Sequence, residues 1–158
     1  MTPLLLSATT ATTCLGRGLA ATRSALREGR SGLAPCAFET VELATWIGEV
    51  PGVDNERLPA PLAAYDCRNN RLTQMALETD GFAERVRQAI ARHGRDRVGV
   101  FLGTSTAGIL QTELAYRRRD PQTGALPADF HYRTTHNSFS LAEFTRDYFG
   151  LTGMAMAI

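Results

Sequence analysis

Residues 103–108 are the first place in the sequence where residue type and spacing could support chemistry. Gly103 and Gly108 have the G-x-x-x-x-G spacing of a loop whose backbone amides hold phosphate at the start of a helix. That motif needs a lysine next, but Ile109 follows and the chain contains no lysine. We therefore do not expect nucleotide triphosphate chemistry. Two interpretations stay open: a turn packed between strand and helix, or a loop whose hydroxyls and amides line a substrate channel.

The three histidines do not form a recognisable metal site. His93 falls at the expected end of a helix, where a cation is mildly favoured, so we interpret it as a solvated end residue. His131 and His136 lie five residues apart in an aromatic loop. No acidic or cysteine residue stands at ligand spacing from them, so a structural or channel-lining role is favoured and no metal is predicted.

No residue has the sequence surroundings of an activated nucleophile. Cys14, Cys36 and Cys67 are odd in number, widely spaced and without a C-x-x-C pair, which favours reduced thiols over disulfides or zinc ligands. Ser105 lies in Gly-Thr-Ser-Thr-Ala rather than in the G-x-S-x-G elbow of hydrolases. The motifs alone therefore predict no catalytic centre in this chain.

The arginines form three groups along the chain. They are Arg68 with Arg71, the arginines between residues 85 and 97, and the run 117–119. Such groups either form solvated helix faces or dock a phosphate-bearing or acidic partner. The net charge is only +1, so the chain as a whole has no strong field for nucleic acid or a membrane surface.

Composition and length indicate one globular α/β domain or part of one. The chain has 158 residues, 44% hydrophobic and 21% charged. It lacks both a basic n-region before a signal sequence and a run of about 18 apolar residues, so we expect a cytoplasmic protein without a membrane span.

Short apolar segments alternate with helical periodicity, which is typical of α/β folds. Buried strands are expected at residues 3–8, 97–102 and 153–158, because their apolar residues are continuous rather than alternating. Another strand is expected at 45–50. Helices are expected after a turn at residues 15–18 up to Gly29, from 68 to 93 with a possible break at Gly81, from 109 to about 119, and from 138 to 149. Asp80 and Ser138 are the expected N-caps.

Several stretches, in order, resemble the N-terminal half of β-ketoacyl-acyl carrier protein synthases, the condensing enzymes of the thiolase-like superfamily. Leu26-Arg27-Glu28-Gly29-Arg30-Ser31-Gly32-Leu33 is similar to the family's L-x-x-G-x-S-G-(I/L), and Trp46-Ile47-Gly48-Glu49-Val50 to its A-G-E-V strand. Residues 97–104 resemble R-V-G-V-x-x-G-(T/S), and residues 135–158 resemble the stretch before the family's nucleophile. Residues 4–9 followed by 14–18, and residues 65–71, also carry the resemblance, and the stretches at 97–104 and 135–158 are the most specific. The resemblance spans the whole chain.

The resemblance implies a thiolase-like α/β fold, present as an incomplete N-terminal half with a mixed sheet and covering helices over residues 1–158. The parent protein would be an acyltransferase that condenses an enzyme-bound acyl thioester with malonyl-carrier protein in fatty acid, polyketide or aryl-polyene synthesis, without a cofactor. The family's catalytic cysteine would fall a few residues beyond Ile158, and its histidines later. The chain alone is therefore expected to be inactive.

The resemblance also implies roles for particular residues. Arg68 and Arg71 match positions that bind the acidic acyl carrier protein, although Cys67 stands where many members have another arginine. Thr106 matches a residue that gates the acyl pocket, and His131 and Tyr132 belong to a segment that reaches toward the partner subunit's pocket. The implied partners are the carrier protein and a second subunit, in a ketosynthase homodimer or a ketosynthase–chain length factor heterodimer.

Two alternatives stay open beside the ketosynthase. A chain length factor, the family's non-condensing partner, would have the same residues up to Ile158 and differ where the cysteine is expected. A self-sufficient module that binds an acyl group or a carrier protein would instead unfold cooperatively as a 158-residue chain.

Overall fold

The computed structural model describes residues 3–38 and 41–158. It is a mixed α/β structure in which short strands pair two by two. The helices are α1 (Leu19–Arg27), α2 (Arg68–Leu77), α3 (Phe82–His93), α4 (Ile109–Arg117) and α5 (Ser140–Tyr148), with 3₁₀ turns η1 (Val53–Asn55) and η2 (Ala60–Tyr65). The strands are β1 (Thr12–Thr13), β2 (Gly16–Arg17), β3 (Leu33–Pro35), β4 (Trp46–Gly48), β5 (Val100–Leu102) and β6 (Ala155–Ala157).

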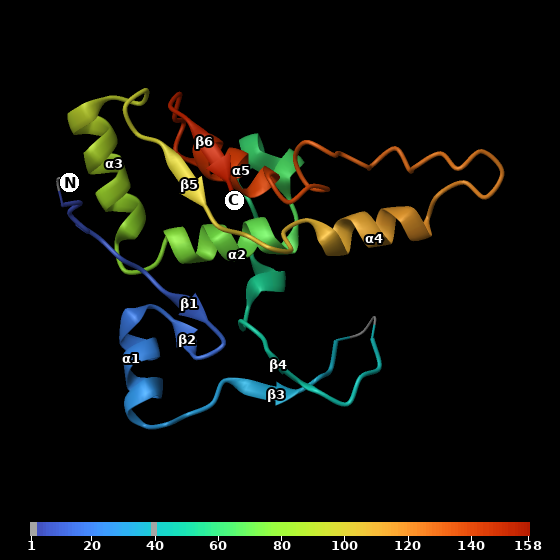
Figure 1. The fold of residues 1–158 in the computed structure, drawn as a ribbon, viewed down its shortest axis with the longest axis horizontal. Coiled ribbons are helices and arrows are strands. Elements are labelled where there is room, and N and C mark those ends of the chain that lie inside the picture. Colours follow the sequence, from blue (N-terminus) through green and yellow to red (C-terminus); the bar gives the residue numbers. More distant parts are fainter. Residues whose placement is uncertain (1–2, 39–40) are drawn as a thin grey trace.

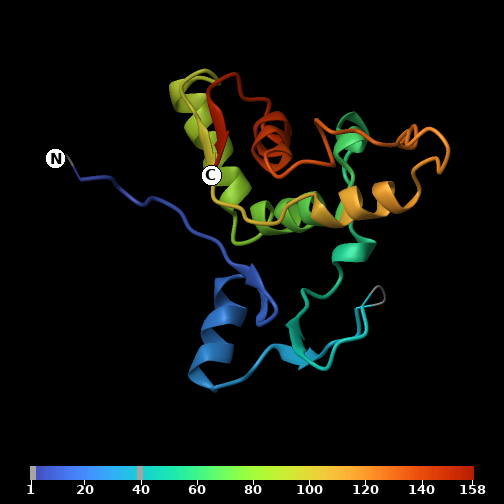
Figure 2. The same ribbon diagram turned by 45° about the vertical axis from the view of Figure 1, so that its right-hand side comes forward.

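The parallel pair β5–β6 brings residues 55 apart in sequence into register, with Val100 opposite Ala155. Hydrogen bonds continue past both strands, from Val100 N to Met154 O at 2.8 Å and from Thr104 N to Ile158 O at 2.9 Å. Helix α5 covers one face of the pair, and Val100, Ala142 and Leu151 form the buried cluster there. Figures 1 and 2 show β5, β6, α2, α3 and α5 gathered in one part of the molecule, which we call the body.

A second packing centre joins α5 to η2 and α2. Phe144 is fully buried, and its ring centroid lies 5.7 Å from that of Tyr65 and 6.0 Å from that of Tyr148. The Tyr65 hydroxyl donates to Asp147 at 2.6 Å. Burial, together with this neighbouring carboxylate, raises the pKa of Tyr65 well above its ordinary value, which keeps the phenol protonated.

The expected helices and the later strands are confirmed, including the break at Gly81, which adopts a left-handed φ of 70°. Both predicted N-caps are wrong. Gly81 occupies the cap position before α3, while the Asp80 carboxylate accepts from Leu19 N, at the start of α1, at 3.0 and 3.2 Å. At α5 the cap position is Phe139, and Asn137 rather than Ser138 accepts hydrogen bonds from the first residues there.

The strand predicted at residues 3–8 is absent, and its leucines lie in solvent. Leu4, Leu5 and Leu6 are 100%, 89% and 80% exposed, on an extended arm that leaves the β1–β2 hairpin (Figures 1 and 2). The prediction that 97–102 and 153–158 are buried is half right, because Phe101 and Met156 project from the face of β5–β6 opposite the buried cluster and are exposed. Among the described residues, neither a third strand nor a second layer covers that face.

The exposed surface is large for the chain's mass. A compact monomer of 17.2 kDa exposes about 7800 Å², whereas this chain exposes 10693 Å². Figure 1 shows where the surplus comes from: α1 and the two antiparallel hairpins lie apart from the body, and α4 with the loop after it projects from the other side. The surface includes exposed apolar side chains that a compact fold would bury.

Candidate functional site

The start of α2 is connected to two distant loops through a pair of asparagines. The Asn69 Oδ1 accepts from the Gly108 backbone amide at 3.1 Å, immediately before α4 begins. Asn70 is fully buried, and its amide donates to Tyr65 O at 2.8 Å and to Thr134 O at 3.5 Å. Together these two side chains fix the 103–108 turn and the 131–136 loop against α2.

Beside these asparagines lies a cavity of about 220 Å³, which we call the Thr106 cavity. Arg68 and Thr106, which the sequence analysis assigned to carrier binding and to the acyl pocket, lie on the same cavity. Thr106 itself is exposed at the rim. The lining residues are Arg68, Asn69, Leu72, Thr106, Gly108, Leu110 and Gln111.

Both candidate carrier-binding arginines are already paired with acidic side chains. The Arg68 guanidinium lies 3.1 Å from Glu49 and 2.9 Å from Asp54. Arg71 makes a bidentate pair with Asp66, at 2.6 and 2.8 Å, and these hydrogen bonds lower the pKa of the Asp66 carboxyl. A partner that binds either arginine must therefore compete with an internal carboxylate.

The two histidines of the 131–136 loop have different environments. His136 is buried: its Nδ1 lies 2.5 Å from the Thr135 hydroxyl and 3.1 Å from the His131 backbone amide, and its ring packs 4.5 Å from that of Phe130. His131 is exposed and holds the loop through its backbone. His136 rather than His131 lines a cavity with Tyr132, so the loop's buried histidine is the one nearest a binding site.

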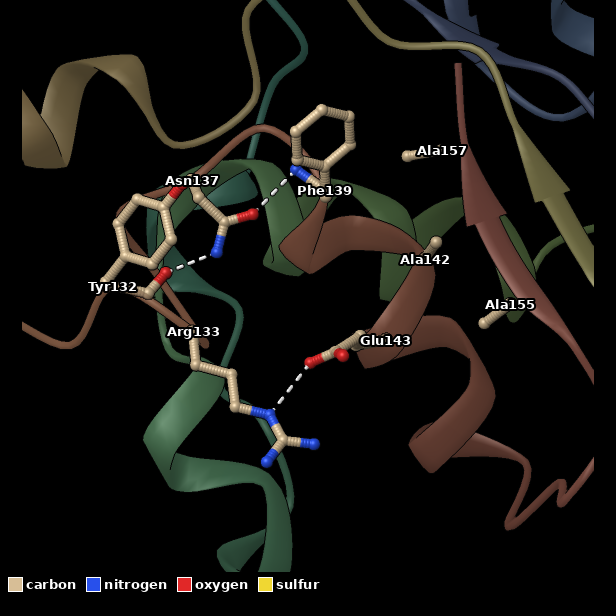
Figure 3. A pocket seen from close by; sticks show the side chains of 8 residues that line it. All are labelled: Tyr132, Arg133, Asn137, Phe139, Ala142, Glu143, Ala155 and Ala157. Atoms are coloured by element: carbon tan, nitrogen blue, oxygen red, sulfur yellow. Dashed lines mark hydrogen bonds and ion pairs between the residues drawn. The ribbon is translucent and has the colours of Figure 1, made fainter.

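Tyr132 also lines a second cavity of about 380 Å³, the Tyr132 cleft, which is shown in Figure 3. The Asn137 amide donates to Tyr132 O and its Oδ1 accepts from Phe139 N at 2.8 Å, so this asparagine shapes the upper wall in the figure. Arg133 pairs with Glu143 at 3.2 Å across the opposite side. The alanines of α5 and β6 form the rest of the lining, through Ala142, Ala155 and Ala157.

The cavities adjoin one another along the molecule. A third cavity of about 290 Å³, which includes His136, shares Gly108 with the Thr106 cavity and shares Tyr132, Asn137 and Phe139 with the Tyr132 cleft. Ala157 is the last residue of β6 and lines the Tyr132 cleft. The line of cavities therefore reaches the carboxyl end of a parallel strand. Ligands of α/β proteins commonly bind at that end.

Among the described residues, this line of cavities contains no recognisable catalytic machinery. No group of three or more His, Cys, Asp or Glu side chains in residues 3–38 and 41–158 is placed to hold a metal ion. Ser105 is exposed, and no described hydrogen bond joins it to a base. Cys67 is buried, and burial raises the pKa of its thiol, which disfavours the nucleophilic thiolate. In this part of the chain the arrangement can bind and position a ligand.

No family model matches the sequence, and no curated protein matches it significantly. A solved structure does: 94% of the chain superposes, with a TM-score of 0.64 and 23% sequence identity, on a chain of the ketosynthase ApeO in complex with its chain length factor ApeC from Xenorhabdus doucetiae. The two folds are the same over that span. The chain covers 37% of the length of that ketosynthase-complex chain. The mixed α/β architecture expected from the sequence is found, and the likeness to that chain concerns the fold alone.

The structure also contributes residues that sequence reasoning missed. Asn69, Asn70 and Asn137 make the hydrogen bonds that shape two of the cavities, yet none was singled out.

Within the described residues, no helix is both long enough and apolar enough to cross a bilayer.

Proposed function

We propose that this chain is the N-terminal portion of a ketosynthase-type condensing protein. The parent protein would take an acyl group as a thioester and join it to a malonyl-carrier protein, with loss of CO₂, to give a β-ketoacyl product. This chain would supply the scaffold, one wall of the acyl pocket and β6, the strand that leads to the nucleophile. The observation that carries the proposal is the superposition of 94% of the chain on a ketosynthase-complex protein.

The line of cavities supports a binding role for an extended ligand. Thr106 and Tyr132 lie on adjoining cavities lined mostly by apolar and small side chains, which suits an acyl chain. His131 remains the proposed contact to a partner subunit, because it is exposed at the surface of the same loop. Arg68 and Arg71 remain proposed contacts to the acyl carrier protein, each in competition with its internal carboxylate.

The large exposed surface favours this reading over a self-sufficient binding module. The uncovered face of β5–β6 and the leucines at residues 4–6 expose apolar area of the kind that parallel sheets normally bury. We therefore expect the isolated chain to aggregate or to unfold without a cooperative transition. A sharp, reversible urea transition of the monomer would favour the module instead.

A chain length factor is the second candidate, since the similar structure is a complex of a ketosynthase with that partner. The deciding experiment expresses the chain together with whatever its gene encodes after Ile158 and assays CO₂ release and β-ketoacyl formation from acyl- and malonyl-carrier protein. Cysteine at the end of β6 with condensation supports the ketosynthase. Another residue there, with condensation only when a ketosynthase is added, supports the chain length factor.

A further inference from the structure

The loop at residues 131–136 fixes which nitrogen of the His136 ring carries the hydrogen. The His131 backbone amide donates to Nδ1 of His136 at 3.1 Å, and the Thr135 hydroxyl lies 2.5 Å from the same nitrogen. The His131 carbonyl also lies 3.1 Å from Nδ1, but it already accepts from the backbone amides of residues 134–136, at 3.0 to 3.3 Å. Nδ1 is therefore the acceptor, and the ring hydrogen is on Nε2.

The Nε2–H group of His136 has no hydrogen-bond partner in the described part of the chain. The atom is nevertheless not sealed from solvent, although the residue as a whole is only 8% exposed. Packing against Phe130, with ring centroids 4.5 Å apart, fixes the orientation of the ring. The ring lines the cavity of about 290 Å³, which we call the His136 cavity. Because Nδ1 faces the loop backbone, Nε2 is the polar edge that remains to face this cavity.

Two other polar side chains of the His136 cavity are already occupied by the backbone. The Thr112 hydroxyl lies 2.9 Å from Gly108 O and 3.0 Å from His136 O. Both ends of the Asn137 amide are bonded to neighbouring backbone atoms. Ser138 is only half-buried. Among the described residues that line this cavity, His136 is therefore the buried one that offers a free donor.

We propose that Nε2 of His136 binds a neutral oxygen, either a hydroxyl or a ketone, on the acyl group that occupies this cavity. The inference rests on the proposed function, because it takes the line of cavities to be the acyl pocket. A buried donor without a partner favours a ligand that supplies an acceptor, and it disfavours an alkyl chain that leaves the donor unpaired. His136 would then determine specificity for oxygen-bearing acyl groups.

The rest of the His136 cavity agrees with a neutral and mostly apolar ligand. An ionised acid on the ligand fits less well than a hydroxyl or ketone, because the exposed carboxylate of Glu113 lines the same cavity and would repel it. Apolar side chains are available to contact the alkyl part of the acyl group. They are Ala107, Ile109 and Phe139.

Two substitutions separate ligand binding from the support that the ring gives to the loop. His136→Asn keeps an acceptor near the position of Nδ1 for the His131 amide and removes the donor at the position of Nε2. His136→Gln keeps a donor close to the position of Nε2. Thr134→Val is the matched control in the same loop. The Thr134 hydroxyl oxygen is buried without a partner among the described residues, so this change removes no described hydrogen bond.

The test uses the chain together with whatever its gene encodes after Ile158. The probes are octanoyl pantetheine with an amide in place of the thioester, so that no acyl group is transferred, and derivatives with one hydroxyl or one ketone at successive carbons. Titration calorimetry measures the dissociation constants. Histidine-selective nitrogen NMR follows the Nε2–H resonance of His136, which is assigned from its absence in the two His136 variants. Circular dichroism checks that each variant keeps its helices.

We expect the best oxygen-bearing probe to bind about three- to tenfold more tightly than the octanoyl probe. It should also shift the Nε2–H resonance of His136, which the octanoyl probe should leave in place. The preference should disappear in His136→Asn, persist in part in His136→Gln and stay unchanged in Thr134→Val. The resonance shift in the unaltered protein decides the question if His136→Asn loses its helices.

Equal binding of all the probes, or a preference that survives in His136→Asn, would overturn the role of His136 and leave the proposed function intact. Water would then be a sufficient partner for Nε2. Failure of every probe to bind, the octanoyl probe included, would overturn the proposed acyl pocket and this inference with it.

Discussion

Residues 3–48 and residues 53–158 are held together in different ways. In the described part of the first region, Ala25 is the one buried apolar side chain, while the leucines at 4–6, Leu26 and Trp46 are exposed. The second region buries Phe144, Met75, Val100 and Leu151 among others. Apolar packing therefore stabilises the body, whereas the N-terminal region has almost no core of its own.

Polar contacts at the corner between α2 and α3 attach the N-terminal region instead. The Asp80 carboxylate accepts from Leu19 N and from the Thr10 hydroxyl at 3.0 Å, and Arg17 Nε donates to Thr79 at 2.9 Å. Such directional contacts fix an orientation but contribute little free energy each. We infer that the N-terminal region opens locally while the body stays folded.

The largest expected effect is on the core of the body. Phe144→Ala removes a ring that is fully buried between Tyr65 and Tyr148, and it should lower the free energy of unfolding by about 3–5 kcal/mol. Trp46→Ala is the matched aromatic change in the N-terminal region, where the side chain is 65% exposed, and it should cost less than about 0.5 kcal/mol. Urea unfolding followed by circular dichroism measures both; because the isolated chain is expected to aggregate, every stability measurement uses the chain together with whatever its gene encodes after Ile158. Similar losses would contradict the division into two regions.

A pair of glycines gives the next largest contrast. Gly108 has φ +76° and a Cβ there would lie 2.9–3.0 Å from backbone atoms of Asn137 and Thr135, whereas Gly29 has φ +62° with open space around it. Gly29→Ala should cost about 1 kcal/mol of backbone strain, and Gly108→Ala about 2–4 kcal/mol because the loop must also move. Thermal unfolding separates them. Binding of carrier protein or an acyl group should fall in Gly108→Ala and not in Gly29→Ala. Equal melting temperatures for the two variants would show that the close contacts at Gly108 add nothing to the cost of its positive φ.

The sequence predicts the elements that depend on local signals and fails where an element depends on a distant neighbour. Helices α1 to α5 follow from 3.6-residue periodicity and glycine boundaries, and β5 and β6 from their continuous apolar residues, because these signals are local. Residues 3–8 have the same apolar pattern as β5, yet they form no strand. A strand needs a neighbouring edge, and among the described residues none pairs with this segment.

The candidate site was less predictable because its contacts join residues that lie far apart in the sequence. Thr106 and Tyr132 could be singled out by resemblance, but Asn69 could not, because its partner Gly108 lies 39 residues away. An asparagine near a helix start is equally consistent with a cap or a solvated surface. The pairing of Arg68 with Glu49 and Asp54 also depends on how the residue after β4 and the turn η1 meet α2, which no local pattern encodes.

Removing the polar attachment should have a smaller and more local effect. Asp80→Asn keeps a residue type that tolerates the positive φ of 57° but replaces the charged acceptor for Leu19 N and Thr10. We expect a loss of about 1–2 kcal/mol confined to local opening of the N-terminal region. Hydrogen exchange should speed up in α1 and stay unchanged in α5. Uniform acceleration across both helices would show that the two regions unfold together.

The smallest effect concerns acid stability, and a carboxylate beside an arginine in each region provides the comparison. Hydrogen bonds from Arg71 hold the pKa of Asp66 below its ordinary value of 3.8. At the exposed C-terminal end of α1, a hydrogen bond from the Ser24 hydroxyl lowers the pKa of Glu28, and Arg30 lowers it further. A lowered carboxyl pKa stabilises the folded state above the unfolded pKa, and this stabilisation is lost as the pH falls through the folded value.

Asp66→Asn should therefore lower stability by less than about 1 kcal/mol near neutral pH, because the Asp66 and Arg71 side chains are 33% and 22% exposed and solvent screens their attraction. The difference from the unaltered chain should shrink as the pH falls below 3.8, the unfolded value for Asp66. Urea midpoints measured from neutral to acid pH test this, with Glu28→Gln as the matched change in the N-terminal region. Since Glu28 lies in a region that opens before the body, its variant should follow the unaltered chain at every pH. Coincident curves for Asp66→Asn and the unaltered chain would show that the Asp66–Arg71 pair contributes nothing to the stability of the body.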